Sequence, residues 1–396
     1  MSSKFPSWCL VCLCCSLHAA TPLFPRFKAI EIDSHVDIGY GVTVADVDGD
    51  GKPDILLADK KQIVWYQNPT WKRFVIAENL TPLDDVCIAA ADVDGSGKAS
   101  IAVGAQWNPS DTVNSGAVFY LIAPADRTQK WEPRELPHEP TVHRMRWMRT
   151  TSGFQLVVAP LHGRGNQGGT GEGVRILSYQ TPADPRQPWK AEVVDSSLHM
   201  THNFDLLKSA DGSKTGMLIA AKEGVFELLK GPSTWSRRQL VGPTPGDAQF
   251  AGAGEVRAGR LTDGSRFLAT VEPMHGTNLV LYTPDPADSQ ALWKRQLLDS
   301  SLQEGHALAC GDLLGNGGEE IVVGWRGKNK EGKVGIKLFS PRHGNATEWS
   351  QTVLDDNTMA CEDLCLADLN NDGKLDIIAS GRATKNLKIY LNQGPQ

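Results

Sequence analysis

Six short segments along the chain share one pattern: an aromatic residue, then polar residues, then a hydrophobic close. Each segment begins with a tryptophan, at Trp71, Trp131, Trp189, Trp235, Trp293 and Trp349. Their spacing of about 45 to 60 residues is typical of propeller blades rather than of helical solenoids. The pattern therefore predicts a β-propeller, in which each repeat forms one four-stranded blade.

The first repeat shows its strands most clearly. Residues 42–45 alternate with a two-residue period, an acidic turn follows, and residues 55–58 are fully apolar. Residues 64–66 supply a third, apolar strand, and residues 71–77 supply the tryptophan-led fourth. Such alternation with β-branched residues is typical of a strand, and a short apolar run between turns is typical of a buried one.

The same order of signals predicts an all-β, seven-bladed propeller over residues 26–394, although 396 residues alone would suggest two or three domains. The expected blades occupy residues 39–78, 85–136, 142–194, 201–241, 252–298, 305–354 and 361–393. The seventh repeat lacks a tryptophan-led strand, and residues 27–33 supply one, with Phe27 in the place of the tryptophan. This N-terminal strand would complete the last blade and close the ring, which removes an exposed sheet edge. Another repeated β architecture is the alternative, but an open solenoid does not need complementary ends.

Composition and the N-terminus narrow the partners and the compartment. The net charge is −6 and no run of Lys or Arg is present, so nucleic acid is not an expected partner. Residues 1–20 resemble a signal peptide, with Lys4 before an apolar run from Trp8 to Leu17. That run is too short to span a membrane, and no second long one follows. We therefore expect a secreted or periplasmic protein without a membrane span, and its oligomeric state stays open.

Two acidic turns between first and second strands have the spacing of a calcium loop. Their side-chain oxygens come from Asp46, Asp48, Asp50 and Asp54 in the first blade, and from Asp368, Asn370, Asp372 and Asp376 in the last. Hard oxygen donors around a glycine-tightened turn suit Ca²⁺, whereas the alternative is a hairpin turn without an ion. The surrounding segments resemble the FG-GAP/VCBS repeats of integrin-type propellers. That resemblance implies the fold, and such propellers serve many roles.

One residue per blade, six positions before the first-strand aspartate or its equivalent, should form a ring around the central channel. The ring consists of Tyr40, Val86, His143, His202, Gly254, His306 and Glu362. Imidazole and carboxylate donors together suit a divalent transition metal such as Zn, Mn or Fe. The sequence therefore predicts His143, His202, His306 and Glu362 as metal ligands in a central funnel. A polar channel filled with water is the alternative.

Residues just after the second strand of each blade should open onto the same face. They are Lys60, Trp107, His162, Lys222, His275, Arg326 and Arg382. Trp can stack on a sugar face, while Arg and Lys bind oxygens, so Trp107, Lys60, Lys222, Arg326 and Arg382 are predicted to bind substrate. His275, His162 and Tyr40 are the predicted acid–base groups. Taken singly, each rim residue is better explained as a solvated loop residue, and the prediction rests on their place together on one rim of one funnel.

Several segments around these residues resemble the propeller domain of the aldos-2-ulose dehydratase/isomerase family. They include VHRMRW at His143, LHMTHNFDLL at His202, EPMHGTNLVLYT at His275 and GHALACGDL at His306. The resemblance implies a metal-assisted dehydratase acting on 1,5-anhydro-fructose or a related keto sugar. In that family a separate cupin portion carries isomerisation, so elimination alone is expected of this sequence.

The combined prediction is an exported, metal-dependent carbohydrate lyase that eliminates water or an alcohol from a small keto sugar. One alternative is a non-catalytic FG-GAP/VCBS propeller that binds glycans or a protein partner. A second alternative is a hydrolase or epimerase that uses the same rim of residues. A purely binding propeller has no need of inward-facing histidines, which favours the enzyme.

Overall fold

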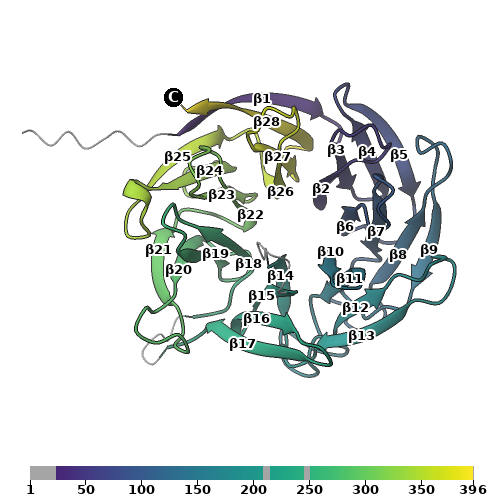
Figure 1. The fold of residues 1–396 in the computed structure, drawn as a ribbon, viewed down its shortest axis with the longest axis horizontal. Helices are drawn as coiled ribbons and strands as arrows, with labels where there is room; N and C mark the ends of the chain where they lie inside the picture. Colours follow the sequence, from purple (N-terminus) through teal and green to yellow (C-terminus); the bar gives the residue numbers. More distant parts are fainter. Residues whose placement is uncertain (1–23, 208–214, 245–249, 396) are drawn as a thin grey trace, which may run out of the picture.

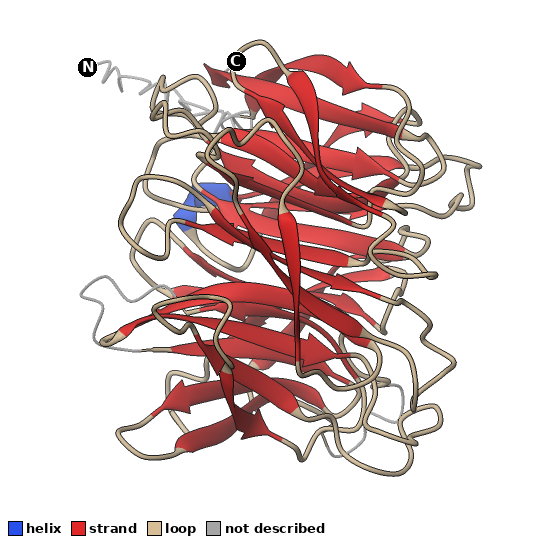
Figure 2. Cartoon of the chain, turned by 90° about the vertical axis from the view of Figure 1, so that its right-hand side faces the viewer, coloured by secondary structure: helices blue, strands red, loops and turns tan. Residues whose placement is uncertain are grey.

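The computed structural model describes residues 24–207, 215–244 and 250–395, and it confirms an all-β propeller of seven four-stranded antiparallel blades (Figure 1). The predicted signal peptide at residues 1–20 lies outside the described residues. Strands make up nearly all the regular structure of the described chain, with one short helical turn at Arg342–Gly344 (Figure 2). No described helix has the length and apolar character that crossing a membrane requires.

Each blade runs from an inner strand at the central axis to an outer strand at the rim. The first three blades comprise β2 (Gly41–Ala45), β3 (Asp54–Ala58), β4 (Gln62–Gln67) and β5 (Lys72–Glu78); β6 (Cys87–Ala91), β7 (Ser100–Ala105), β8 (Ala117–Ile122) and β9 (Glu132–Leu136); and β10 (Val142–Thr150), β11 (Gly153–Pro160), β12 (Ile176–Gln180) and β13 (Lys190–Asp195). The next three comprise β14 (Thr201–Leu206), β15 (Gly216–Ala221), β16 (Gly224–Lys230) and β17 (Trp235–Val241); β18 (Glu255–Arg260), β19 (Arg266–Glu272), β20 (Asn278–Thr283) and β21 (Lys294–Asp299); and β22 (Gly305–Gly311), β23 (Glu320–Trp325), β24 (Gly335–Pro341) and β25 (Trp349–Asp356).

The last blade joins the two ends of the chain, as the sequence predicts. It contains β26 (Cys361–Ala367), β27 (Asp376–Gly381), β28 (Asn386–Pro395) and, at its outer edge, β1 (Pro25–Asp33). β1 pairs antiparallel with β28, placing Ile30 opposite Ile389, and Figure 1 shows the two strands side by side. Because backbone hydrogen bonds between the chain ends close the ring, no blade is left without a neighbour.

The repeated tryptophans hold the blades together at their outer edges. Trp131, Trp189 and Trp293 are each less than one-tenth exposed. The backbone N–H of Trp131 donates to the carbonyl of Ile76 in the preceding blade, and that of Trp293 donates to Leu240 in the same way. The indole N–H of Trp189 donates to the carbonyl of Pro185 at 3.0 Å. A large apolar ring that also satisfies its own donor suits this position between two sheets.

Candidate functional site

Four inner strands contain a β-bulge at their first residues. The pairing register shifts between Val142 and Arg144 in β10, between Thr201 and Phe204 in β14, between Gly305 and Ala307 in β22, and between Cys361 and Asp363 in β26. The residues left out of the ladder include His143, His202, His306 and Glu362, which are the polar members of the predicted ring. A bulge re-aims a side chain and interrupts pairing, so these four residues can face the channel axis.

The bulges also connect neighbouring blades. His143 Nδ1 lies 2.8 Å from the carbonyl oxygen of His202, and His202 Nδ1 lies 2.9 Å from that of Gly254. His306 Nδ1 lies 2.5 Å from the carbonyl oxygen of Glu362. Since a carbonyl can only accept, each imidazole carries its proton on Nδ1 and leaves the Nε2 lone pair free of that proton. The ring is therefore built from one blade to the next, through side chain to backbone contacts.

Three imidazoles meet on the channel axis. His202, His275 and His306 each present a ring nitrogen, and these nitrogens all lie within 4.8 Å of one another. His202 Nε2 is 2.6 Å from His275 Nε2, and the His275 and His306 ring centroids are 4.8 Å apart. His275 comes from the turn after β19 and has left-handed backbone geometry, with φ of 53°. Residues held in this sparsely populated region are frequent at ligand sites.

The three imidazoles are held in the neutral form that binds metals. Burial lowers the pKa of His202, and burial lowers that of His306 well below its usual value. Burial, with His202 and Arg326 nearby, lowers the pKa of His275 to about 2. Neutral imidazole is the ligating state, so this group needs no proton release before it binds a cation.

Two of the predicted metal ligands lie outside this three-histidine group. His143 Nε2 is 3.2 Å from Nη1 of Arg144, which can only donate, and its ring stacks on Trp107 at 4.9 Å between centroids. Glu362 accepts hydrogen bonds from Arg326 at 2.7 and 2.8 Å and from Arg382 at 3.0 Å. Both side chains are thus engaged by arginines, and the geometry favours His275 as the third ligand in their place.

The predicted rim residues are partly brought together. Tyr40 donates to Asp84 Oδ2 at 3.1 Å, and the guanidinium of Arg382 lies 5.4 Å from the Tyr40 ring. Lys222 Nζ donates to the carbonyl of Gly168 at 3.3 Å and so contacts the glycine-rich loop of residues 162–173. Lys60 has an exposed side chain, whereas His162 is buried.

Two titratable rim groups have shifted pKa values. Burial, with Asp84 nearby, raises the pKa of Tyr40 to about 12. Burial lowers the pKa of His162, and its Nδ1 has no hydrogen-bond partner within the described chain. Tyr40 is therefore a proton donor at neutral pH, and His162 is a neutral imidazole.

The carboxylates of the first acidic turn have two different environments. Asp46, Asp48 and Asp50 present oxygens within 4.8 Å of one another in a partly exposed turn. Asp54 is instead buried and accepts hydrogen bonds from the backbone N–H groups of Val47 and Asn68.

The last blade repeats this division. Asp376 accepts from Leu369 and Asn392, while Asp368, Asn370 and Asp372 lie in the exposed turn. Asp54 and Asp376, the ninth residues of the two turns, therefore each link the turn to the end of the blade's third strand by hydrogen bonds.

Sequence reasoning missed the charged groups beside the ring. Glu255 Oε1 lies 3.2 Å from His202 Nδ1, and its carboxylate also contacts Asn203 and Arg257. Both Arg144 and Glu255 directly follow a ring residue, and ordinary strand alternation would turn them away from the channel. The sequence signal that could have indicated them is a charged residue directly after a residue expected to face the channel.

Comparisons with known proteins relate the chain to two families. Residues 115–285 match the family described as aldos-2-ulose dehydratase, β-propeller domain, and residues 46–103 match the FG-GAP-like repeat. Aldos-2-ulose dehydratase of Phanerodontia chrysosporium is 28% identical over 318 residues, which cover 73% of this chain and 34% of that protein. The resemblance inferred from the sequence is thus confirmed, and the chain is related to a carbohydrate dehydratase of which it spans about a third.

Solved structures support the fold alone. A chain in the crystal structure of BBS1N in complex with ARL6DN aligns with a TM-score of 0.56 at 12% identity, covering 93% of this chain and 96% of that one. A chain of the mitotic checkpoint complex aligns with a TM-score of 0.53 at 12% identity, covering 99% of this chain and 100% of that one. At this identity, function does not follow from the shared architecture.

Proposed function

We propose that this protein is an exported, metal-dependent carbohydrate lyase that eliminates water or an alcohol from a small keto sugar. The observation that carries the proposal is the neutral three-histidine group on the channel axis. The sequence match to a carbohydrate dehydratase includes His202 and His275, since both lie within residues 115–285. Export rests on the signal-like residues 1–20 and is part of the proposal.

The donor set suits a divalent transition metal. Three imidazole nitrogens are a common catalytic zinc set, and Mn²⁺ and Fe²⁺ also accept imidazole. The backbone carbonyls of Gly254 and Glu362 fix the orientation of the His202 and His306 rings, as partners of metal-binding histidines commonly do. When bound, such a cation supplies Lewis-acid polarisation of a ketone oxygen, an effect of several kcal/mol.

The chain's own side chains would divide the proton transfers. His162 is neutral and buried with an unpartnered Nδ1, so it can accept the proton from a carbon next to the ketone. Tyr40 keeps its proton at neutral pH and can donate it to the leaving oxygen. General acid–base assistance of this kind contributes about 10²–10⁴-fold in rate.

The rim residues would position the sugar. Trp107 already stacks on His143 and is partly exposed, so its free face can receive a pyranose ring. Arg326 and Arg382 are tied to Glu362 and present a preorganised pair of guanidinium groups. Such a pair suits the oxygens of a sugar in which negative charge develops during the reaction.

The test is incubation of the purified protein with 1,5-anhydro-fructose and, separately, with a 3-keto glycoside, while enone absorbance is followed. Metal-free protein and protein reloaded with Zn²⁺, Mn²⁺ or Fe²⁺ are compared. We expect an absorbance rise only with reloaded protein. Exchange of a carbon-bound proton in D₂O without loss of water would indicate epimerisation, and release of a sugar without an enone would indicate hydrolysis.

The rival function is a non-catalytic propeller that binds glycans or a protein partner. The FG-GAP-like match and the grouped oxygens of Asp46, Asp48 and Asp50 favour it. On that reading calcium binds in the turns of the first and last blades and has a structural role. A protein that takes up calcium, binds no transition metal and turns over neither sugar would support the rival.

A further inference from the structure

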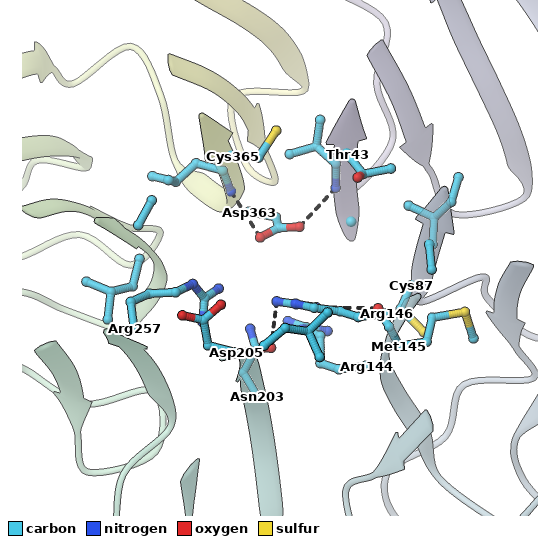
Figure 3. A pocket seen from close by; sticks show the side chains of 18 of the residues that line it. Thr43, Cys87, Arg144, Met145, Arg146, Asn203, Asp205, Arg257, Asp363 and Cys365 are labelled. Atoms are coloured by element: carbon cyan, nitrogen blue, oxygen red, sulfur yellow. Dashed lines mark hydrogen bonds between the residues drawn. The ribbon is translucent and has the colours of Figure 1, made fainter. Parts of the chain in front are cut away.

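A cavity lies in the channel, mainly on the other side of the ring from the predicted rim. It has a volume of about 350 Å³ and is lined mostly by inner-strand residues that follow the ring positions, with Tyr40 of the ring also in its lining (Figure 3). The inner strands are buried at their first residues and become partly exposed toward their last ones, as in β2, β14 and β26. The cavity is therefore reached from the face opposite to the loops that carry His162 and His275.

Three arginines from two blades line this cavity. Arg144 and Arg146 extend from β10, and Arg257 extends from β18 across the channel (Figure 3). The β10 bulge at His143 sets the alternation of the strand so that Arg144 and Arg146 share its channel face. Neither of these two side chains forms an ion pair with a described residue, whereas Arg257 lies 3.3 Å from Glu255.

Several hydrogen-bond donors in the cavity have few acceptors. Among the described residues, Arg146 donates to Met145 O at 3.4 Å and Asn203 Oδ1 at 3.1 Å and lies 5.0 Å from the centre of the Phe204 ring, whereas a guanidinium has five N–H groups. Arg144 is 5% exposed, and its Nε has no partner in the described part of the chain. The indole N–H of Trp147, which also lines the cavity, is likewise without an acceptor there.

The carboxylates that line the cavity already have protein partners. Asp363 accepts from the backbone N–H groups of Val42 at 2.9 Å and Leu364 at 3.0 Å. Asp205 Oδ2 accepts from the N–H of Ala258 at 3.3 Å. Although these carboxylates lie in the same cavity, Arg144 Nε and Trp147 Nε1 remain without an acceptor within the described residues.

We propose that this cavity is a binding site for a small oxyanion, a carboxylate or a phosphate, held by the guanidinium groups of Arg144, Arg146 and Arg257. The planar fork of an arginine matches two oxygens of either group, and such charge-assisted contacts are among the strongest hydrogen bonds. The volume lies within the range of small-ligand sites. The proposal does not depend on the function proposed above.

The site is linked to the histidines by direct contacts. Arg144 donates to Nε2 of His143, and Arg257 pairs with Glu255, which contacts His202. An anion bound below the ring would therefore share two residues with the network that orients the imidazoles. Sugar acids and sugar phosphates carry the required group, so their free anionic ends define the class of ligand to try.

The test is isothermal titration calorimetry of the purified protein with acetate, gluconate, inorganic phosphate and sulfate, and with glucose as the neutral comparison. We expect at least one oxyanion to bind at millimolar concentration or below, and glucose not to bind. Tighter binding of acetate or gluconate would identify a carboxylate, and tighter binding of phosphate or sulfate would identify a tetrahedral oxyanion.

Arg146→Gln should weaken that binding by about 10-fold or more, because it removes a charged fork from the cavity. Arg149→Gln is the matched control, since Arg149 is exposed on the same strand, and it should bind as the unsubstituted protein does. If Arg146→Gln does not fold, Arg146→Lys keeps the charge without the fork and should still weaken binding. Absence of binding by all four oxyanions, or equal affinity in the Arg146 variants and the unsubstituted protein, overturns the proposal.

Discussion

The two ends of the inner strands carry donor atoms of different kinds. Where β14 and β22 begin, neutral imidazoles from His202 and His306 meet His275 in a largely buried group. Where β2 ends, Asp46, Asp48 and Asp50 group their oxygens in a turn that is partly exposed. Nitrogen donors in a dry site suit a transition metal, and clustered carboxylates suit calcium.

The two groups also differ in what assembles them. The acidic turn is made by five consecutive residues, so one blade suffices to form it. The histidine group takes its members from three consecutive blades and forms only when these blades pack beside one another. Disturbing the ring should therefore affect the histidine group, and disturbing a single turn should leave it intact.

The largest effect is expected at the histidine group. His275→Ala and His202→Ala should each lower transition-metal affinity by at least about 100-fold and turnover of a keto sugar by about 10³-fold. His35→Ala is the control, because that side chain is 91% exposed. Metal content by elemental analysis and enone formation are measured, with circular dichroism to confirm folding. Unchanged metal content and activity in both variants would show that the histidine group does not bind the transition metal.

The next effect concerns the ion pairs that hold the ring. Glu362 is 1% exposed and binds Arg326 and Arg382, so Glu362→Gln leaves two guanidinium groups without their carboxylate. We expect a loss of about 3 kcal/mol in the free energy of unfolding, measured by urea denaturation. Glu304→Gln removes only the exposed partner of Arg326 and should cost less than about 1 kcal/mol. Equal losses in the two variants would argue against a role for burial.

Substitution of Asp85, near the start of β6, should change the free energy of unfolding in a pH-dependent way. Substitution of Asp54, at the start of β3, should be destabilising at every pH tested. Asp85 is buried with one oxygen unpartnered, and burial raises its pKa to about 7. Because the folded pKa exceeds the unfolded value of about 3.9, the stability that this group contributes is full below pH 3.9 and is lost as pH rises through 7. Asp85→Asn should therefore raise the unfolding free energy above pH 7 by about 2 kcal/mol and have no such benefit at pH 4. A gain that is the same at both pH values would contradict this assignment.

Asp54 provides the comparison for that measurement. Its pKa is raised to about 6 by burial, but both of its oxygens accept backbone N–H groups. Asp54→Asn replaces one acceptor oxygen by a donor, so it should destabilise the protein on both sides of pH 7. At pH 8 we expect Asp85→Asn to raise the free energy of unfolding and Asp54→Asn to lower it. If both substitutions raise it, the two carboxylates do not differ in the way proposed.

The smallest effect is expected in the acidic turn. Calcium in tenfold excess over its dissociation constant should stabilise the protein by about 1.4 kcal/mol, seen as a rise in Tm. Asp50→Asn should reduce this rise, because Asp50 is one of three grouped donors. Asp94→Asn, in the turn between β6 and β7 of the second blade, is the control, because Asp94 does not belong to that group of donors. A calcium response that persists unchanged in Asp50→Asn would place the ion elsewhere.

The sequence predicts the seven blades and their closure because both depend on local patterns. The tryptophan spacing marks each outer strand, and Phe27 in the place of the seventh tryptophan indicates β1. Stepping back from the first-strand aspartate also locates His202 and His306 on the ring. These two then lie beside His275, a residue that the same alignment assigns to the rim.

What the sequence does not predict depends on contacts between blades. Bulges shift β10 and β26 by one residue, and no local motif marks them. Glu362 in β26 pairs with Arg382 of its own blade and with Arg326 of the preceding blade, and no local motif distinguishes a carboxylate paired in this way from a metal ligand. The cavity lined by Arg144, Arg146 and Arg257 likewise appears only when the inner strands are placed around one axis.

The most direct test of the central claim is X-ray absorption spectroscopy of the purified protein after it is loaded with zinc. The account predicts one zinc per chain with nitrogen or oxygen neighbours at about 2.0–2.1 Å and the scattering pattern of three imidazoles. His275→Ala should lose one of the three. Zinc that fails to bind, or a zinc spectrum without imidazole that is the same in His275→Ala, would contradict it.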